Sequence, residues 1–379
     1  MKGRDVIVKA LENEGVKVIF GYPGGTSMEI HQGLTLTKKI RMVLPRHEQG
    51  GSFAAGGYAR STGEVGVCMA TSGPGATNLI TGIIDAKMDS IPIVAITGQV
   101  ASTLLGSDAF QETDIMGATF PLVKHSYMIQ NVEEIPRIVH EAFHIARSGR
   151  PGPVLIDIPK NIQQQEGIAD FDVSFDCPSY KPNLKPSVLQ CKKAAHTIQT
   201  AKRPIIYAGG GIISSGASEE LRAFAKKTGI PVTTTAMGLG AFPSNDPLSL
   251  RMLGMHGAVY ANIAINHADL VIAMGVRFDD RVTGKLAEFC KNAQFIQIDI
   301  DPTEINKNIT IDVPIQGDVK QALKILTGYV EPKKDIKPWV KQVNEWKKEF
   351  PLEFELKKGE IVPQSVVSDI NKLAAKDAI

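Results

Sequence analysis

The strongest constraint on the fold is a regular alternation of short apolar runs and amphipathic helical segments. In residues 1–160, the apolar runs 64–70, 91–98 and 153–159 are separated by helical patterns such as 131–149. Apolar strands that alternate with helices are typical of a parallel sheet covered on both faces by helices. The chain is therefore predicted to be an α/β protein, with ligands bound at the carboxyl ends of its strands.

The alternation occurs twice, so we predict two doubly wound domains. The residues between the two series lack periodicity and are rich in Gln, Asp, Ser and Pro, as linkers are. We place the first domain at 1–165, the linker at 166–187, the second domain at 188–330, and a linker helix with the beginning of a third domain at 331–379. Because the sequence ends on a helical pattern with no sheet after it, we expect a fragment of a longer enzyme.

Charge and cysteine content exclude several classes of protein. The 379 residues include 42 Lys and Arg against 40 Asp and Glu, without a dense basic block, which argues against binding to nucleic acid or to an anionic membrane. No apolar run approaches the roughly 18–20 residues of a membrane-spanning helix. Four separated cysteines without a C-x-x-C pair argue against a disulfide framework or a zinc site, so a cytoplasmic location is predicted.

The segment LPRHEQGG places a carboxylate, Glu48, where an apolar run passes into a helix of small residues. Most glutamates are solvated surface groups, and that interpretation stays open unless other features support a site. Glycine-rich loops after predicted strands, at 21–25, 71–78 and 208–212, indicate close approach by a ligand or by another chain segment. The run 208–212 does not match G-x-G-x-x-G, so a standard Rossmann pyrophosphate site is not predicted.

The helical segment 131–149, with Asn131 as its expected cap, contains HEAFH, which matches the H-E-x-x-H zinc pattern. His140 and His144 fall on the face opposite the apolar stripe, so we expect them to point toward solvent, beside Arg147. A cation at that position would repel a metal ion, and we predict no metal site.

In their order along the chain, these motifs resemble the large catalytic subunit of the acetohydroxyacid (acetolactate) synthases, a family of thiamine-diphosphate enzymes. The resemblance covers essentially all 379 residues, through strings such as GYPGG, LPRHEQG, TSGPGATNLITGI, GRPGPVLIDIPK, TTTAMGLGAFP and GVRFDDRVTGK. It implies a pyrimidine-binding first domain, an FAD-binding second domain and the start of a diphosphate-binding third. It also implies decarboxylation of pyruvate and condensation with a second 2-oxo acid, giving 2-acetolactate or 2-aceto-2-hydroxybutyrate for branched-chain amino acid biosynthesis.

The resemblance assigns Glu48 a role. In this family, the glutamate of RHEQG hydrogen-bonds a ring nitrogen of the cofactor's aminopyrimidine, and we expect Glu48 to be shielded from solvent. Arg281 matches the arginine thought to hold the carboxylate of the acceptor oxo acid, which suits its forked donors. The positions that match the active-site channel are Gly25, Phe110, Gln111 and Lys160.

For FAD, the resemblance implies contacts from glycine-rich loops, arginines and strand-end acids. The matching positions are Arg150, Gly209, Gly210, Gly211, Thr235, Leu253, Gly254, Met255, His256, Gly275, Val276, Arg277, Asp279, Arg281, Val282, Asp299, Ile300, Gly317 and Asp318. Arginines and glycine amides suit a pyrophosphate, and a strand-end acid suits a ribose. In these synthases the flavin performs no net redox step and looks chiefly structural.

The sequence departs from the family pattern in four places. The family commonly has histidine and aspartate where this chain has Phe53 and Gly56, and threonine at Ala258, so packing near the cofactor is expected to differ. The G-D-G…N signature that binds magnesium and the diphosphate is absent, because Gly317-Asp318 is followed by valine. We therefore expect the magnesium ligands to lie outside this chain, which on its own should be inactive.

The resemblance further implies a homodimer and a small regulatory subunit. Two alternatives stay open: another thiamine-diphosphate enzyme, such as pyruvate oxidase or a flavin-free catabolic acetolactate synthase, or a non-catalytic flavin-binding module. Flavin absorbance separates the flavin-free enzyme from the rest, and dependence on oxygen or a quinone would favour the oxidase.

Overall fold

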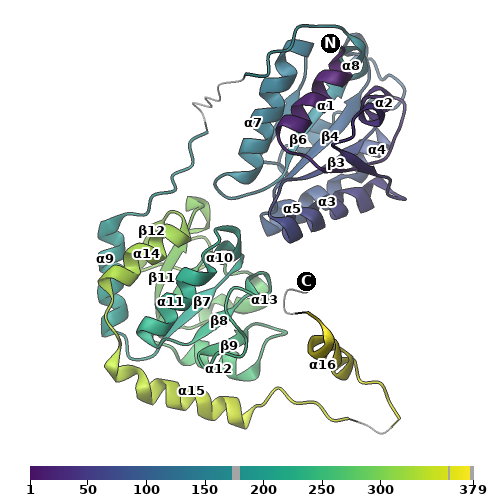
Figure 1. Ribbon diagram of the computed structural model, residues 1–379. Coiled ribbons are helices and arrows are strands. Elements are labelled where there is room, and N and C mark those ends of the chain that lie inside the picture. Colours follow the sequence, from purple (N-terminus) through teal and green to yellow (C-terminus); the bar gives the residue numbers. More distant parts are fainter. Residues whose placement is uncertain (173–179, 357–358, 376–379) are drawn as a thin grey trace. The chain divides into compact units, whose positions relative to one another are not determined.

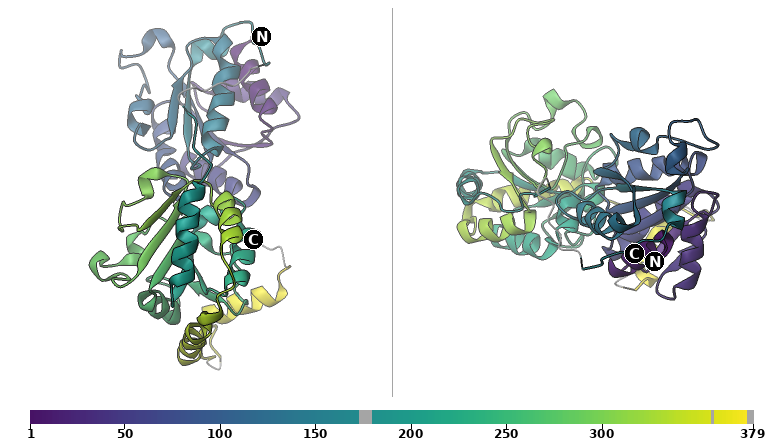
Figure 2. Two further views of the ribbon diagram at one scale, coloured as in Figure 1. Left: turned by 90° about the vertical axis from the view of Figure 1, so that its left-hand side faces the viewer. Right: turned by 90° about the horizontal axis from the view of Figure 1, so that it is seen from above.

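The computed structural model describes residues 1–172, 180–356 and 359–375 and divides into two units, Met1–Pro182 and Asn183–Ile379 (Figure 1). Each unit contains a six-stranded parallel sheet with helices on both faces (Figures 1 and 2). The prediction of two successive doubly wound α/β domains is confirmed. Part of the predicted linker, 173–179, and with it Cys177, lies outside the described residues.

The sheet of the first unit has the order β2-β1-β3-β4-β6-β5. Every residue of β3, β4 and β6 is buried, in agreement with their largely apolar sequences; the polar exceptions are Thr97, Gln99 and Asp157. The strand bounds are β1 (Val18–Gly21), β2 (Arg41–Val43), β3 (Gly66–Ala70), β4 (Ile93–Gln99), β5 (His125–Met128) and β6 (Val154–Pro159).

Two apolar cores lie on the two faces of this sheet. One core is formed with α1 (Gly3–Asn13), α2 (Met28–Leu36), α7 (Ile135–Arg147) and α8 (Lys160–Gln164), and the other with α3 (Glu48–Thr62), α4 (Pro74–Asn78), α5 (Ile80–Asp89) and α6 (Ile115–Thr119). Helices α4 and α5 follow each other directly, and Leu79, which joins them, keeps helical backbone angles. Asn131 does not cap α7 with its side chain, because a 3-10 turn, Val132–Glu134, precedes that helix.

The sheet of the second unit has the order β12-β11-β10-β7-β8-β9. Its strands are β7 (Pro204–Ala208), β8 (Val232–Thr234), β9 (Ser249–Met252), β10 (Leu270–Met274), β11 (Gln294–Asp299) and β12 (Val313–Gln316). The helices are α9 (Val188–Thr200), α10 (Gly210–Ser214), α11 (Ser218–Thr228), α12 (Val259–His267), α13 (Asp280–Thr283), α14 (Val319–Tyr329), α15 (Lys337–Glu349) and α16 (Pro363–Leu373).

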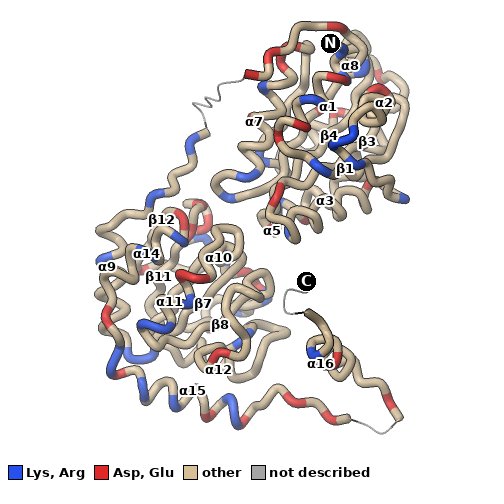
Figure 3. The backbone as a smooth tube through the Cα atoms, in the orientation of Figure 1, with Lys and Arg blue, Asp and Glu red and all other residues tan. Residues whose placement is uncertain are grey.

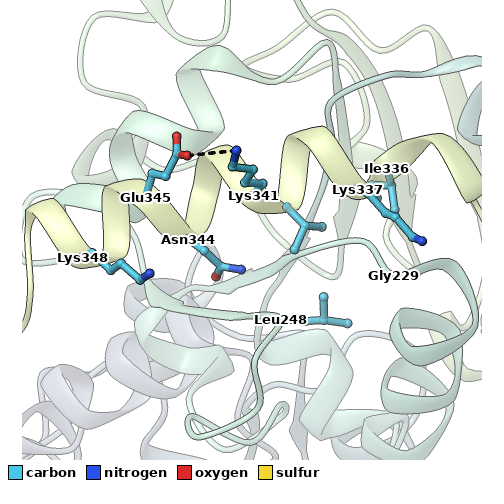
Figure 4. Close-up of a pocket in the computed structure, with 9 residues that line it drawn as sticks. Gly229, Leu248, Ile336, Lys337, Lys341, Asn344, Glu345 and Lys348 are labelled. Carbon is cyan, nitrogen blue, oxygen red and sulfur yellow. Dashed lines mark ion pairs between the residues drawn. The ribbon is translucent and has the colours of Figure 1, made fainter.

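Helix α15 packs on the second unit. The buried Trp339 donates its indole N–H to the carbonyl of Pro204 at 3.0 Å, and Val343 is also buried. A groove of about 530 Å³ runs along this helix, and no predicted site residue lines it (Figure 4). Its lining is Gly229, Leu248, Ile336, Lys337, Val340, Lys341, Asn344, Glu345 and Lys348.

In each sheet the chain adds later strands on both sides of its first strand. In the first unit, the chain moves to β2 on one side of β1 and to β3 on the other; in the second, β8 and β10 flank β7 in the same way. Loops that follow the strands at such a point diverge and leave a crevice, where α/β proteins bind ligands. We refer to these places as the β1–β3 crevice and the β7–β10 crevice.

Acidic and basic residues are interspersed over both units (Figure 3). Among the described residues, no helix is both long enough and apolar enough to cross a membrane.

Candidate functional site

The loops of the β1–β3 crevice are held to each other by hydroxyl groups. The Thr26 and Thr71 hydroxyls lie 2.9 Å apart, and the backbone N–H of Ser72 donates to the Thr26 hydroxyl at 2.9 Å. A Cβ atom on Gly24 would lie only 2.5 Å from the Thr71 side chain, so the loop after β1 can approach only because that position lacks a side chain. Gly25, which follows, is exposed and has nothing within 4 Å of a built Cβ atom.

Glu48 is the first residue of α3 and reaches this crevice. The Asn78 side chain donates to Glu48 Oε2 at 3.0 Å, and Oε1 lies 3.3 Å from the Cβ position of Gly75. Glu48 is half-buried in this chain, not fully shielded as the sequence led us to expect, and the neighbouring Gly75 has no side chain that could cover it. Asn78 is a site residue that motif reasoning did not single out.

The segment Ala101–Asp114, which we call the β4–α6 loop, carries Phe110 and Gln111. Gln111 has a positive φ of 59°, and its carbonyl oxygen lies 2.7 Å from the Cβ position of Gly73. The loop therefore lies against the residues that follow β3, beside the crevice. Phe110 is 88% exposed, so its ring is free to contact a ligand.

Lys160 is the first residue of α8 and is half-buried. It follows β6, which is separated from β3 by β4, so it lies farther along the same edge of the sheet. The structure thus brings Glu48 and Gln111 to one crevice and places Lys160 at its flank.

A buried carboxylate under the β4–α6 loop was not predicted from the sequence. Asp157 in β6 is 1% exposed; it accepts hydrogen bonds from the Thr97 hydroxyl at 2.7 Å and from Gln99 Nε2 at 3.0 Å. Burial, reinforced by the charge of Asp114, raises the pKa of Asp157 to about 6, although both hydrogen bonds oppose this shift. The signal in the sequence was a charged residue inside the apolar run VLIDIP.

His140 in the HEAFH segment and Arg147, which follows it on α7, both contact the carboxylate of Glu14. His140 Nδ1 lies 2.5 Å from Glu14 Oε1, and Arg147 lies 3.5 Å from the other oxygen of the same carboxylate. The prediction that both histidines face solvent is only partly right, since both are half-buried, and burial lowers the pKa of His144. Among the described residues, no group of three or more His, Cys, Asp or Glu is arranged to hold a metal ion.

In the β7–β10 crevice, the glycines contact each other. A Cβ atom on Gly209 would lie 2.1 Å from the carbonyl oxygen of Gly275, and one on Gly211 would lie 2.6 Å from the Gly275 Cα. The N–H groups of Gly209 and Gly211 donate to the carbonyls of Met274 and Gly275. The sequence left open whether a ligand or another chain segment approaches these glycines. The structure shows that the segment at Gly275 does, and this contact is sufficient to explain the glycines at 209 and 211.

The arginine-bearing loop after β10 is anchored by Phe278. This residue has a positive φ of 49° and is 2% exposed, with its ring in edge contact with Tyr207 and Phe295 at centroid distances of 5.8 and 5.9 Å. Non-glycine residues adopt such φ values only where the surroundings enforce them. The anchor leaves Arg277 half-buried and Arg281 exposed, so both guanidinium groups are accessible.

The other predicted FAD positions of the second unit follow its strands, and several build the loops themselves. Met255 N–H donates to the Arg281 carbonyl at 2.8 Å, which joins the loops after β9 and β10. Asp279 and Asp318 accept the N–H of Arg281 and Gln321, and thereby cap α13 and α14. The remainder of this set is Gly210, Thr235, Leu253, Gly254, His256, Val276, Val282, Asp299, Ile300 and Gly317.

Two further positions named in the sequence analysis, Arg150 and Ala258, are not part of this set. Arg150 belongs to the first unit, where its Nε donates to the Ser90 hydroxyl at 2.8 Å. Ala258 precedes α12 as its N-cap residue and has no hydroxyl for the cap that the family's threonine could form.

The donors present in the second unit fit a flavin dinucleotide. Arg277 and Arg281, half-buried and exposed, lie in the loop after β10, and Asp299, 8% exposed, ends β11, the strand next to β10. A carboxylate at a strand end can accept a hydrogen bond from a ribose hydroxyl. The glycine N–H groups used within the loops are not available for a pyrophosphate. A magnesium site does not fit the described residues.

Comparison with known proteins identifies the family. Residues 1–118 match the thiamine pyrophosphate enzyme N-terminal TPP binding domain, and residues 191–326 match the thiamine pyrophosphate enzyme central domain. Over its whole length the chain is 53% identical to acetolactate synthase 3, chloroplastic, of Brassica napus, 52% to acetolactate synthase 1, chloroplastic, of Zea mays and 51% to acetolactate synthase, chloroplastic, of Arabidopsis thaliana. The alignments cover 59%, 60% and 57% of these relatives' own lengths. The resemblance inferred from the motifs is confirmed: the chain belongs to the thiamine pyrophosphate enzyme family and is related within it to the acetolactate synthases.

Proposed function

We propose that the chain is the pyrimidine-binding and flavin-binding part of an acetolactate synthase. The reaction is the decarboxylation of pyruvate and the condensation of the remaining two-carbon unit with a second pyruvate or with 2-oxobutyrate. Identity above 50% to three chloroplast acetolactate synthases supports this activity. The observation that carries the proposal is the Glu48 carboxylate at the β1–β3 crevice, held on one oxygen by Asn78.

Glu48 would control a proton on the cofactor. Thiamine diphosphate supplies the carbanion chemistry when it is bound. Asn78 donates to Oε2, while no hydrogen bond from a described residue is seen at Oε1, which lies near the side-chain-free Gly75. Oε1 is therefore the oxygen that would take a hydrogen bond from a protonated ring nitrogen, and such positioned proton transfer contributes about 10²- to 10⁴-fold to a rate.

The remaining predicted residues would bind substrate. Gln111 beside the crevice and Lys160 at its flank present donors for a 2-oxo acid, and the exposed ring of Phe110 would exclude water from it. The exposed Arg281 suits the carboxylate of the acceptor oxo acid, because its guanidinium group can donate two parallel hydrogen bonds.

FAD would bind at the β7–β10 crevice. The arrangement of Arg277, Arg281 and Asp299 around a doubly wound switch point supports this site. Flavin absorbance that co-purifies with the chain is the expected observation, and its absence at saturating FAD would favour the flavin-free catabolic enzyme.

A second copy of the chain would cover the first domain. Phe53 on α3, and Ile84 and Met88 on α5, are 40%, 38% and 52% exposed, although they are large apolar side chains. A homodimer would bury them and would supply the shielding that Glu48 lacks here. The small regulatory subunit stays a prediction. A reducing compartment such as the cytoplasm is supported by the free, buried state of Cys68, Cys191 and Cys290.

The test compares Glu48→Gln with the unchanged chain. Each is assayed for acetolactate with pyruvate, thiamine diphosphate, FAD and Mg²⁺, both alone and fused in frame to the part of a chloroplast relative that follows the matched region. We expect activity in the unchanged fusion, and a loss of about 10²- to 10⁴-fold in Glu48→Gln. An unchanged rate in Glu48→Gln would contradict the proposal, and a fusion that binds flavin without turnover would favour the non-catalytic module.

A further inference from the structure

The β4–α6 loop is tied at both ends to the short segment that surrounds Lys160. At its start, the Ser102 N–H donates to Asn161 Oδ1 at 2.8 Å, and Asn161 Nδ2 donates to the Ser102 hydroxyl at 3.0 Å. Asn161 is the residue after Lys160 on α8. One side chain thus makes two hydrogen bonds to the first turn of the loop.

At the other end, the link passes through Gln99. Its Nε2 donates to the Thr113 carbonyl at 2.9 Å and to Asp157 Oδ2 at 3.0 Å, while its Oε1 accepts the Val100 N–H at 2.8 Å. Gln99 is 2% exposed, and both N–H groups and the carbonyl of its amide are used, so the amide has a single orientation. The buried Asp157 oxygen determines that orientation, because a reversed amide would place a carbonyl oxygen against it.

The middle of the loop is held by its own carboxylate. Glu112 accepts hydrogen bonds from the N–H groups of Gly106 and Ala109, the latter at 3.0 Å, and these bonds lower the pKa of Glu112. The loop is therefore internally ordered, and its placement on the domain depends on the two ends.

We propose that Asp157 and Asn161 are positioning residues, which hold the two ends of the β4–α6 loop and so place Phe110 and Gln111 beside the residues that follow β3. They lie three residues before and one residue after Lys160, so the same strand-to-helix junction places the lysine and the loop. The consequence for catalysis rests on the proposed function, because Phe110, Gln111 and Lys160 are the residues expected to contact substrate.

The test is hydrogen–deuterium exchange of the full chain, read by mass spectrometry on peptides from the loop and from the surrounding strands. Asn161→Ala should speed exchange at least tenfold in residues 101–107. Asp157→Leu, which keeps the branched shape of the side chain but removes the acceptor for Gln99, should do so in residues 108–114. The strands β3 and β4 should keep the exchange rates of the unchanged chain.

Conservative variants separate positioning from packing. Asn161→Asp retains acceptors for both Ser102 groups, and Asp157→Asn retains an acceptor for Gln99, so both should stay within threefold of the unchanged chain. Gln164→Ala is the control on α8, because Gln164 bonds Glu29 and not the loop. If Asp157→Leu unfolds the domain, Gln99→Met removes the same link.

Unchanged loop exchange in Asn161→Ala and Asp157→Leu would overturn the inference, as would acceleration spread evenly over β3, β4 and the loop. Equal effects of Asp157→Leu and Asp157→Asn would do the same. The assay contains no substrate or cofactor, so a failure of the proposed function leaves its outcome unaffected.

Discussion

The two crevices arise from the same kind of strand reversal but use their glycines in opposite ways. In the β1–β3 crevice, Gly25 has open space around it and Glu48 presents a carboxylate. In the β7–β10 crevice, Gly209, Gly211 and Gly275 pack backbone against backbone. At the first crevice, Gly25 leaves space in which a ligand could lie beside the Glu48 carboxylate. At the second, the glycine loops pack directly on each other, and the arginines lie next to these packed loops.

This difference shows that a glycine run at a strand end has no single meaning. Gly25 is available to a ligand because nothing in its own domain approaches it, whereas Gly275 brings two strand ends together. A substitution that adds one methyl group should therefore separate the two cases.

The largest expected effect is that of Gly275→Ala. Gly275 has a φ of 61°, and its Cβ position lies 2.5 Å from the Gly211 Cα, so the methyl group meets backbone that cannot rotate away. Overpacking and left-handed strain together should cost about 3 kcal/mol of the free energy of unfolding of the second unit. Urea unfolding followed by tryptophan fluorescence measures it, because Trp339 and Trp346, the only two tryptophans, are in that unit.

Gly25→Ala is the matched control in the first unit. With nothing within 4 Å of its Cβ position, it should change stability by less than about 0.5 kcal/mol, as measured by circular dichroism. Equal costs for the two variants would remove the distinction between the crevices.

The next effect concerns the pH dependence of the first unit. Burial raises the pKa of Asp157 from 3.8 to about 6, so the folded unit binds the proton more tightly than the unfolded chain. The resulting stabilisation is complete below pH 3.8 and is lost as the pH rises through about 6, at most roughly 3 kcal/mol in total. The unfolding free energy of the unchanged chain minus that of Asp157→Asn should fall by most of this amount between pH 4 and pH 7, measured by urea unfolding and circular dichroism.

Asp114→Asn tests the source of the shift. Asparagine keeps the cap of α6, which the Asp114 side chain makes to Gly117, but removes the negative charge that disfavours ionisation of Asp157. The midpoint of the stability change should move to lower pH. A difference between Asp157→Asn and the unchanged chain that stays flat over this range would show that the carboxylate ionises freely.

The strands that the sequence analysis missed share one physical property. β2, β5, β9 and β12 are the edge strands of the two sheets, and each has exposed or half-buried residues. An edge strand is covered less completely than a central one, so it need not be continuously apolar, and no such run marks it. The apolar runs identified from the sequence, 64–70, 91–98 and 153–159, became β3, β4 and β6 inside the first sheet, so the fold class was predicted correctly although the edge strands were not.

The sequence predicted those site residues whose role follows from their chemical type. It did not predict those whose role depends on how the chain packs. Glu48 was found because a carboxylate in that motif has a family role. Its exposure, its bond to Asn78 and the burial of Asp157 depend on which segments the fold brings together. Asp279 and Asp318 show the converse, because residues selected as ligands of a cofactor also cap helices.

The smallest expected effect tests that double role at Asp318. Its carboxylate accepts the Gln321 N–H at 3.0 Å as the N-cap of α14, so Asp318→Ala should lower the unfolding free energy of the second unit by about 1 kcal/mol. Asp318→Asn retains a side-chain acceptor and should retain the stability. Flavin titration separates the functions: if the carboxylate only caps the helix, both variants bind FAD as the unchanged chain does. Weaker FAD binding by Asp318→Asn, at unchanged stability, would instead show that the Asp318 carboxylate contacts FAD. The second crevice would then also use a carboxylate to bind its ligand, as is proposed for Glu48 in the first.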